Sequence, residues 1–167
     1  MANLIKNRKL VLDSWHLLKE VSDLDAIADK AGQNLIVPLV FWLEHRQILK
    51  QRPGKTAVWL ESNELPTALG EDLHSLGLIA LNFPVFSDGR AYSSARELRD
   101  NFMFKGELRA IGDVLRDQLF YMARCGFDAF ALREDQNIDK ALKAFDDFRE
   151  CYQVSVDQPE PLFRRRG

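Results

Sequence analysis

The fold is decided by residues 65–83, LPTALGEDLHSLGLIALNF. The first part repeats leucine at spacings of four, four and three, which is the pattern of one apolar helix face, and Gly77 follows as a helix-ending residue. Residues 78–83 then form an apolar run of strand length. A helix followed at once by an apolar strand is one repeat of a βα architecture, so we looked for further repeats on either side.

Four more apolar runs have strand length, and they span residues 35–37, 57–60, 107–111 and 127–132. The starts of the five runs lie about 20 to 30 residues apart, which is the spacing of a βα unit. Helix patterns lie between them, including one that begins with Asp113 as N-cap and a last one that begins near Asn137. The pattern predicts an α/β domain of about five βα units around a mainly parallel sheet. Its form stays open between an open doubly wound sheet and a partial barrel.

The two ends of the chain differ from this βα core, which we place at residues 35–153. Residues 1–34 predict an N-terminal extension: LIKNRKLVLDSW is a small hairpin or edge strand, and SDLDAIADKAG is a short helix. Residues 154–167 contain two prolines and predict an extended C-terminal arm. The chain therefore reads as one domain with two extensions.

The composition is typical of one globular domain, with 46% apolar and 29% charged residues among 167. No apolar run approaches the roughly 20 residues that span a bilayer, and no signal peptide is visible, so we expect a cytoplasmic protein. A formal net charge of −2 argues against nucleic-acid binding. Cys125, Cys151 and three scattered histidines lack metal-ligand spacing, so neither a metal site nor a cofactor is evident.

Polar chemistry gathers in FPVFSDGRAYSSARELR, residues 83–99. Ligands of parallel α/β sheets bind outside the carboxyl ends of the strands, and the predicted strand 78–83 ends here. The following helix start suits an anion, and Asp88 is a candidate general base. Ser94 and Glu97 fit the spacing of a capping box. The candidate anion ligands in this stretch are Arg90, Ser93 and Arg96.

A second unusual stretch is GELRAIGDVLRDQ, residues 106–118. Glu107 and Arg109 alternate with apolar residues, whereas a central parallel strand is normally apolar on both faces. Either this is an edge strand with one wet face, or both side chains project into a polar interior or cleft. Asp113 follows the strand as a second candidate base. Arg116 and Asp117 come next and complete the candidate ligand set.

Charges of both signs balance from Asp88 to Asp117, with six acids and six bases. Such a cluster is either an internal salt-bridge network that fixes the loops or a site in which arginines hold a small anion. The sequence leaves both interpretations open.

These two stretches, with the continuation LFYMARCGFDAF, resemble the core of a bacterial family known as domain of unknown function 934. The segments VWLES and PLFRRR extend the resemblance through most of the chain. The resemblance implies a link to sulfur assimilation, because members of that family are encoded beside sulfite reductase and labelled as oxidoreductases of sulfite reduction.

Two functions are compatible with the resemblance and the residues. The first is an accessory protein of assimilatory sulfite reduction with an anion-binding cleft, and the second is a small enzyme or oxidoreductase that acts on an anionic metabolite. A self-sufficient reductase is not expected, because the chain has neither four cysteines for an iron–sulfur cluster nor a GxGxxG motif. An accessory protein would contact a reductase subunit through its tail, although a solvated terminus or an arm folded onto its own domain explains the tail equally well. The tail residues are Leu162, Phe163, Arg164, Arg165 and Arg166.

Overall fold

The computed structural model describes residues 3–146, and the strands in this range form one curled sheet in the order β2-β1-β8-β7-β6-β5-β4-β3. The strands are β1 (Asn3–Lys6), β2 (Lys9–Leu12), β3 (Trp15–Leu17), β4 (Asn34–Pro38), β5 (Thr56–Leu60), β6 (Leu78–Phe83), β7 (Glu107–Gly112) and β8 (Ala129–Phe130). All five strands predicted from the apolar runs are therefore present. No helix in the described range is long and apolar enough to cross a membrane.

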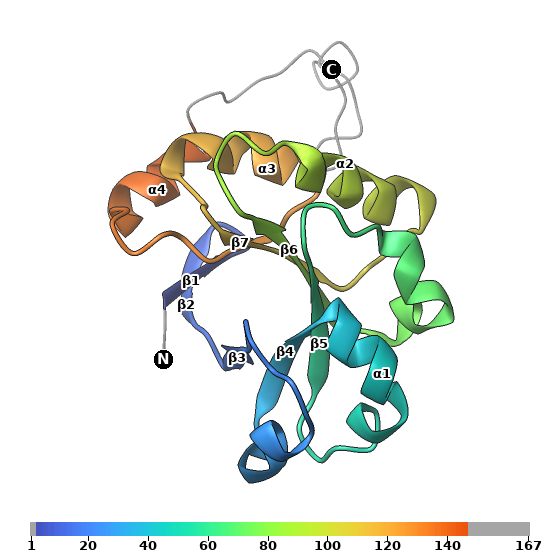
Figure 1. Cartoon of the computed structure of the whole chain (residues 1–167). Coiled ribbons are helices and arrows are strands. Elements are labelled where there is room, and N and C mark those ends of the chain that lie inside the picture. The colour runs from blue at the N-terminus through green and yellow to red at the C-terminus, as the bar shows by residue number, and fades with distance from the viewer. Residues whose placement is uncertain (1–2, 147–167) are drawn as a thin grey trace.

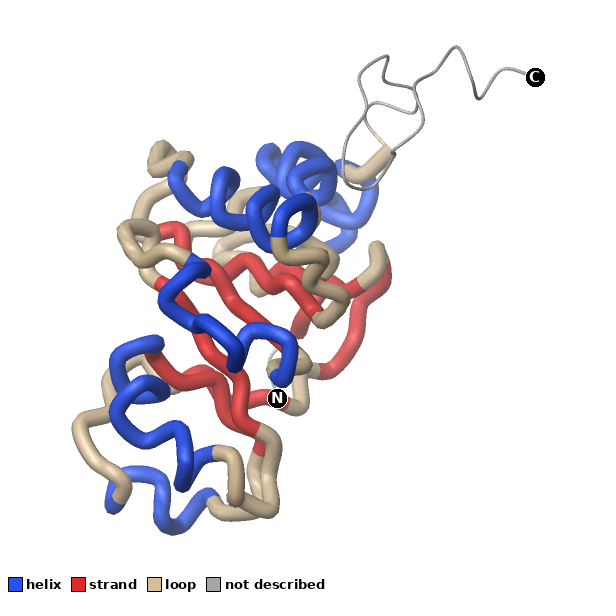
Figure 2. The backbone as a smooth tube through the Cα atoms, turned by 90° about the vertical axis from the view of Figure 1, so that its right-hand side faces the viewer, coloured by secondary structure: helices blue, strands red, loops and turns tan. Residues whose placement is uncertain are grey.

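The sheet is a half-barrel whose helices lie on its outer face. Strands β3 to β8 are parallel and follow one another in chain order, and the helices surround them on the convex side (Figure 1). Seen from the side, the helices lie as a layer over the strands (Figure 2). The predicted α/β class and its partial-barrel form are confirmed, whereas the doubly wound alternative is wrong because it requires helices on both faces.

The α-helices are α1 (Leu39–Leu49), α2 (Arg90–Arg96), α3 (Leu119–Cys125) and α4 (Ile138–Ala144). Shorter 3₁₀ segments are η1 (Asp25–Lys30), η2 (Pro66–Ser75) and η4 (Arg116–Gln118), and the π-helical η3 (Glu97–Asn101) continues α2.

Residues 3–17 are part of the sheet, at both of its edges. The predicted hairpin is present: β1 and β2 pair antiparallel around Asn7 and Arg8, whose positive φ values suit a two-residue hairpin turn. β1 also pairs with β8, whereas β3 pairs with β4 at the opposite edge. Only Asp13 and Ser14 separate β2 from β3, so the sheet edges lie within about 11 Å of each other there. The half-barrel is therefore almost closed at this point.

Side-chain alternation along the strands divides the apolar residues into two cores. The larger core lies between the sheet and the helices. A smaller core lines the inner face, where Trp59, Leu78 and Ile111 pack together. Glu107 and Arg109 share that inner face, because they lie four and two residues before Ile111 on β7, which is a central strand between β6 and β8. The edge-strand explanation of these polar residues is therefore wrong, and a polar interior is observed.

Three helix predictions need correction. The helix expected over residues 65–76 is a 3₁₀ segment broken at Gly70, which has a φ of 53°, although Leu69 and Leu73 are buried as expected. The helix expected from Asp113 begins only at Arg116 as η4 and at Leu119 as α3. The last helix begins as predicted, with Asn137 as its side-chain cap. Its expected continuation to Tyr152 and the C-terminal arm lie outside the described residues.

Burial of Tyr92 makes the free energy of unfolding depend on pH in the alkaline range. Its ring packs edge-on against the rings of Phe83 and Tyr121, with centroid distances of 5.1 and 4.8 Å. Burial raises the pKa of the Tyr92 phenol from 10.0 to about 12. The folded state therefore favours the protonated phenol, and the stability this gives is complete below pH 10 and is lost as the pH rises through 12.

We expect urea unfolding at pH 9 and pH 11 to show a smaller loss of stability in Tyr92→Phe than in the wild type, because phenylalanine cannot ionise. Equal losses in the two proteins would contradict this role of Tyr92.

Candidate functional site

A pocket of about 660 Å³ opens at the carboxyl ends of the parallel strands, where ligands of such sheets normally bind. We call it the mouth pocket. Trp59 and Ile111 form part of its apolar floor, and its rim is charged. The charged rim residues are Lys19, Glu20, Glu61, Asp113 and Arg133. Because the rim carries two positive and three negative charges, it is poorly suited to binding an anion.

Asp113 lies on this rim because the chain turns sharply at Gly112, which has a φ of 89°. The Asp113 amide donates to the Phe83 carbonyl at 2.7 Å and so ties the end of β7 to the end of β6. One carboxylate oxygen accepts the Phe86 amide at 2.8 Å, and the other accepts a guanidinium N–H of Arg133 at 2.6 Å. Asp113 is therefore a loop-fixing residue, and the prediction that it caps a helix is wrong.

Asp88 and Arg90 form an ion pair beside the mouth pocket. The Arg90 guanidinium donates to both carboxylate oxygens, at 3.0 and 2.6 Å, and also to the Ser62 hydroxyl at 2.9 Å. These hydrogen bonds, chiefly that from Arg90, hold the pKa of Asp88 well below its usual range. A carboxylate that resists protonation to this degree is a weak general base.

The start of α2 differs from the expected capping box. α2 begins at Arg90, and Gly89 before it has a φ of −86°, outside the left-handed region. Ser94 lies buried inside α2, and no side chain caps the helix start. The capping-box prediction for Ser94 is therefore wrong.

The remaining predicted ligands on the helices do not line the mouth pocket. Ser93 and Arg96 are exposed on α2. The Arg116 side chain donates to the Lys140 carbonyl at 3.1 Å, and the Asp117 carboxyl group is 89% exposed. The structure therefore does not bring these four residues together with Asp88 and Asp113.

Glu107 and Arg109 belong to a buried ion network inside the half-barrel. Arg109 is only 2% exposed and donates to Glu107 at 2.7 Å and to Asp13 at 2.8 Å. Lys6 completes the network through the other Glu107 oxygen at 2.6 Å. Sequence reasoning missed Lys6 and Asp13. They lie 101 and 96 residues from their partners on β7 and come close to them only because the sheet curls.

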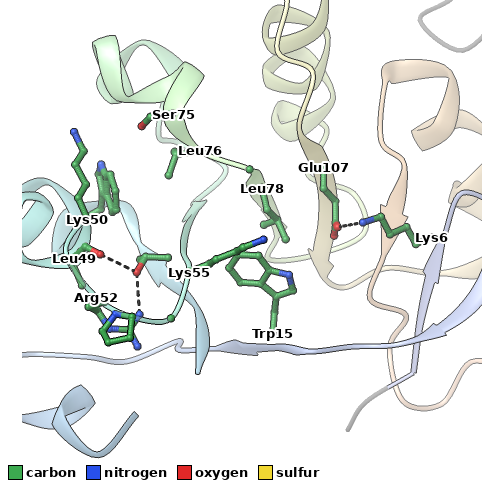
Figure 3. A pocket seen from close by; sticks show the side chains of 15 residues that line it. Lys6, Trp15, Leu49, Lys50, Arg52, Lys55, Ser75, Leu76, Leu78 and Glu107 are labelled. Carbon is green, nitrogen blue, oxygen red and sulfur yellow. Dashed lines mark hydrogen bonds and ion pairs between the residues drawn. The ribbon is translucent and has the colours of Figure 1, made fainter. Parts of the chain in front are cut away.

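A second pocket, of about 770 Å³, opens at the amino ends of the strands (Figure 3). We call it the amino-end pocket. Its lining includes Glu107 and four cations that no local motif indicated: Lys6, Lys50, Arg52 and Lys55. Lys50, Arg52 and Lys55 come from the loop between α1 and β5, and the topology brings Lys6 of β1 to the same pocket.

Metal chemistry has no visible basis in residues 3–146, which contain no group of three or more histidine, cysteine or acidic side chains that could hold an ion. Cys125 is buried as a free thiol at the end of α3, whereas Cys151 lies outside the described range.

Residues 57–163 match the model of the family described as bacterial protein of unknown function (DUF934). The chain belongs to this family. The DUF934 match runs from β5 through α4 and contains Asp88, Arg90, Arg109 and Asp113, whereas Lys6 and Asp13 precede it. The description of DUF934 assigns no activity, and none of the curated proteins compared with the chain matches it.

Proposed function

We propose that this DUF934 protein is a cytoplasmic accessory protein of assimilatory sulfite reduction that docks onto a sulfite reductase subunit. The link to sulfite reduction rests on the resemblance of residues 83–99 and 106–130 to proteins encoded beside that enzyme. The docking role rests on one structural observation, three large apolar side chains exposed on the hydrogen-bonded loops after β5 and β6. The surface consists of Leu65, Val85 and Phe86, and we call it the apolar rim.

The apolar rim lies on two loops that hydrogen bonds hold in place. Leu65, Val85 and Phe86 are 61%, 51% and 58% exposed, and they lie on the loops that follow the neighbouring strands β5 and β6. The hydrogen bond from Arg90 to Ser62 joins these two loops. Large apolar side chains in such positions are candidates for the few residues that dominate binding between proteins.

The backbone of Phe86 is held from both sides. Its amide donates to Asp113, and its carbonyl accepts the side-chain amide of Gln118 at 2.8 Å. The Asp88 amide donates to the Val85 carbonyl at 3.0 Å and closes the loop. A loop that is ordered before a partner arrives loses little conformational entropy on binding, which favours a docking role.

The charge pairs at the mouth also favour docking over catalysis. Asp88 pairs with Arg90, and Asp113 is held by Arg133 and the Phe86 amide, so both carboxylates already have partners within the loops. Residues 162–166 of the arm are a second proposed contact, outside the described range.

The test is a pull-down of purified sulfite reductase subunits with Phe86→Asp, which we expect to weaken association at least tenfold by placing a charge in the apolar contact. Ile48→Asp is the matched control, because Ile48 is 52% exposed near the end of α1, beside the amino-end pocket residues Leu49 and Lys50, and should bind like the wild type. Equal binding by both variants, or no association of the wild type, would overturn the proposal.

A further inference from the structure

The amino-end pocket concentrates positive charge on a chain whose net charge is negative. Its lining has four cations against one carboxylate, whereas the whole chain carries a formal charge of −2. Its volume falls within the range of roughly 300–1,000 Å³ that is usual for small-molecule sites. The pocket is therefore large enough for an organic ligand as well as a simple ion.

Two of these cations have no carboxylate partner. Lys6 pairs with Glu107, and Lys50 pairs with Asp72. Arg52 instead donates to neutral oxygens: the carbonyls of Lys30, Ala31 and Gln33 at 2.6, 3.4 and 3.2 Å, and the Thr56 hydroxyl at 3.0 Å. Lys55 has no ion pair within residues 3–146, and its side chain extends toward the middle of the pocket (Figure 3). The charges of Arg52 and Lys55 thus remain available to an anion.

The loop that carries Lys55 is fixed by its backbone. The Lys55 amide donates to the Asn34 side chain at 3.1 Å, and the Lys55 carbonyl accepts the Leu35 amide at 2.9 Å. Gly54 is buried against Gln33 so closely that a Cβ would overlap the Gln33 carbonyl. Lys55 therefore starts from a defined position, unlike a lysine on a mobile surface loop.

Trp15 contributes a planar apolar ring to the pocket lining, and its indole N–H group has no acceptor within residues 3–146. The chain has three tryptophans, and two of them satisfy their indole N–H groups: Trp42 with Asp72 at 3.2 Å and Trp59 with the Leu18 carbonyl at 2.9 Å. The Trp15 indole N–H has no hydrogen-bond acceptor in the described part of the chain, and Trp15 lines the pocket (Figure 3). Trp15 is half-buried, and indole rings commonly stack on planar ligands.

We propose that the amino-end pocket binds a small organic phosphate with a planar ring, with the ring against Trp15 and the phosphate held by the charges of Lys55 and Arg52. Inorganic anions would leave the apolar wall unused. This site lies at the opposite end of the strands from the apolar rim, so it is independent of the docking role.

The test is calorimetric titration with adenosine monophosphate and phenyl phosphate, with adenosine and inorganic phosphate as partial ligands. We expect both ring phosphates to bind more tightly than either partial ligand, and Lys55→Ala to weaken them at least tenfold. Lys19→Ala is the matched control, because Lys19 lines the mouth pocket instead, and it should leave binding unchanged. A ¹H–¹⁵N spectrum should show the indole signal of Trp15, assigned with Trp15→Phe, moving on binding.

Three results would overturn the proposal: no binding of either ring phosphate at millimolar concentration, equal binding by Lys55→Ala and the wild type, or inorganic phosphate binding as tightly as the ring phosphates. Loss of reductase docking with intact phosphate binding would contradict only the proposed function.

Discussion

Replacing Arg109 by methionine is expected to lower the free energy of unfolding by about 3–5 kcal/mol. Methionine fills much of the same space, but it leaves the carboxylates of Glu107 and Asp13 without the guanidinium that neutralises them. Both carboxylates are largely buried, with side-chain exposures of 8% and 14%, so water cannot replace the lost partner. Urea denaturation followed by circular dichroism measures the effect.

Arg90→Met is the matched control for this prediction. Arg90 also pairs with an aspartate, but its side chain is 61% exposed, and exposed pairs contribute at most about 1 kcal/mol. Adding Asp13→Asn to Arg109→Met should recover part of the loss, because Arg109 is the cation that pairs with Asp13, whereas Glu107 keeps Lys6. Similar small effects of Arg109→Met and Arg90→Met would show that the interior network is not structural.

The second large effect is expected for Gly112→Ala, with a loss of about 2–4 kcal/mol in the free energy of unfolding. Gly112 has a φ of 89°, which strains any residue with a side chain, and a Cβ there would overlap the Phe83 carbonyl oxygen and the Asn82 side chain. The strand ends would have to separate, and the Asp113 amide would lose its bond to Phe83. Thermal and urea unfolding measure the loss.

Gly77→Ala controls for the general effect of adding a methyl group to a glycine. Gly77 has no strained φ, and no atom lies within 4 Å of where its Cβ would be, so a change of no more than about 1 kcal/mol is expected. If Gly77→Ala and Gly112→Ala were equally stable, the close contact of β6 and β7 would not constrain residue 112.

The strand pattern was predictable because β4, β5 and β6 are short apolar runs buried on both faces, and β7 and β8 lie within similar runs. The same rule explains why β3 was assigned to an N-terminal hairpin or edge strand: Trp15–Leu17 is only three residues long and includes His16. The order of the strands was not predictable, because the sequence records which segments are apolar and not which of them become neighbours. The break at Gly70 was likewise hidden, since the leucine spacing of residues 65–76 fits an α-helix as well as a kinked 3₁₀ segment.

The candidate site was predictable only in part. The strand-end rule located Asp88, Arg90 and Asp113 at the carboxyl end of the sheet, and that is where they lie. The partners that determine their chemistry were not visible, since Arg133 reaches Asp113 across 20 residues and Asp13 reaches Arg109 across 96. Charge balance alone does not distinguish a ligand site from an ion network, because both need the same residue types.

The most direct test of the docking role is hydrogen–deuterium exchange of the purified protein with and without a sulfite reductase subunit. We predict slower exchange in residues 84–90, which carry Val85 and Phe86, and in residues 62–66, which carry Leu65. The amino-end loop of residues 50–56 should exchange at the same rate in both samples. Unchanged exchange in both rim loops, or protection confined to residues 50–56, would contradict a docking surface at the carboxyl ends of the strands.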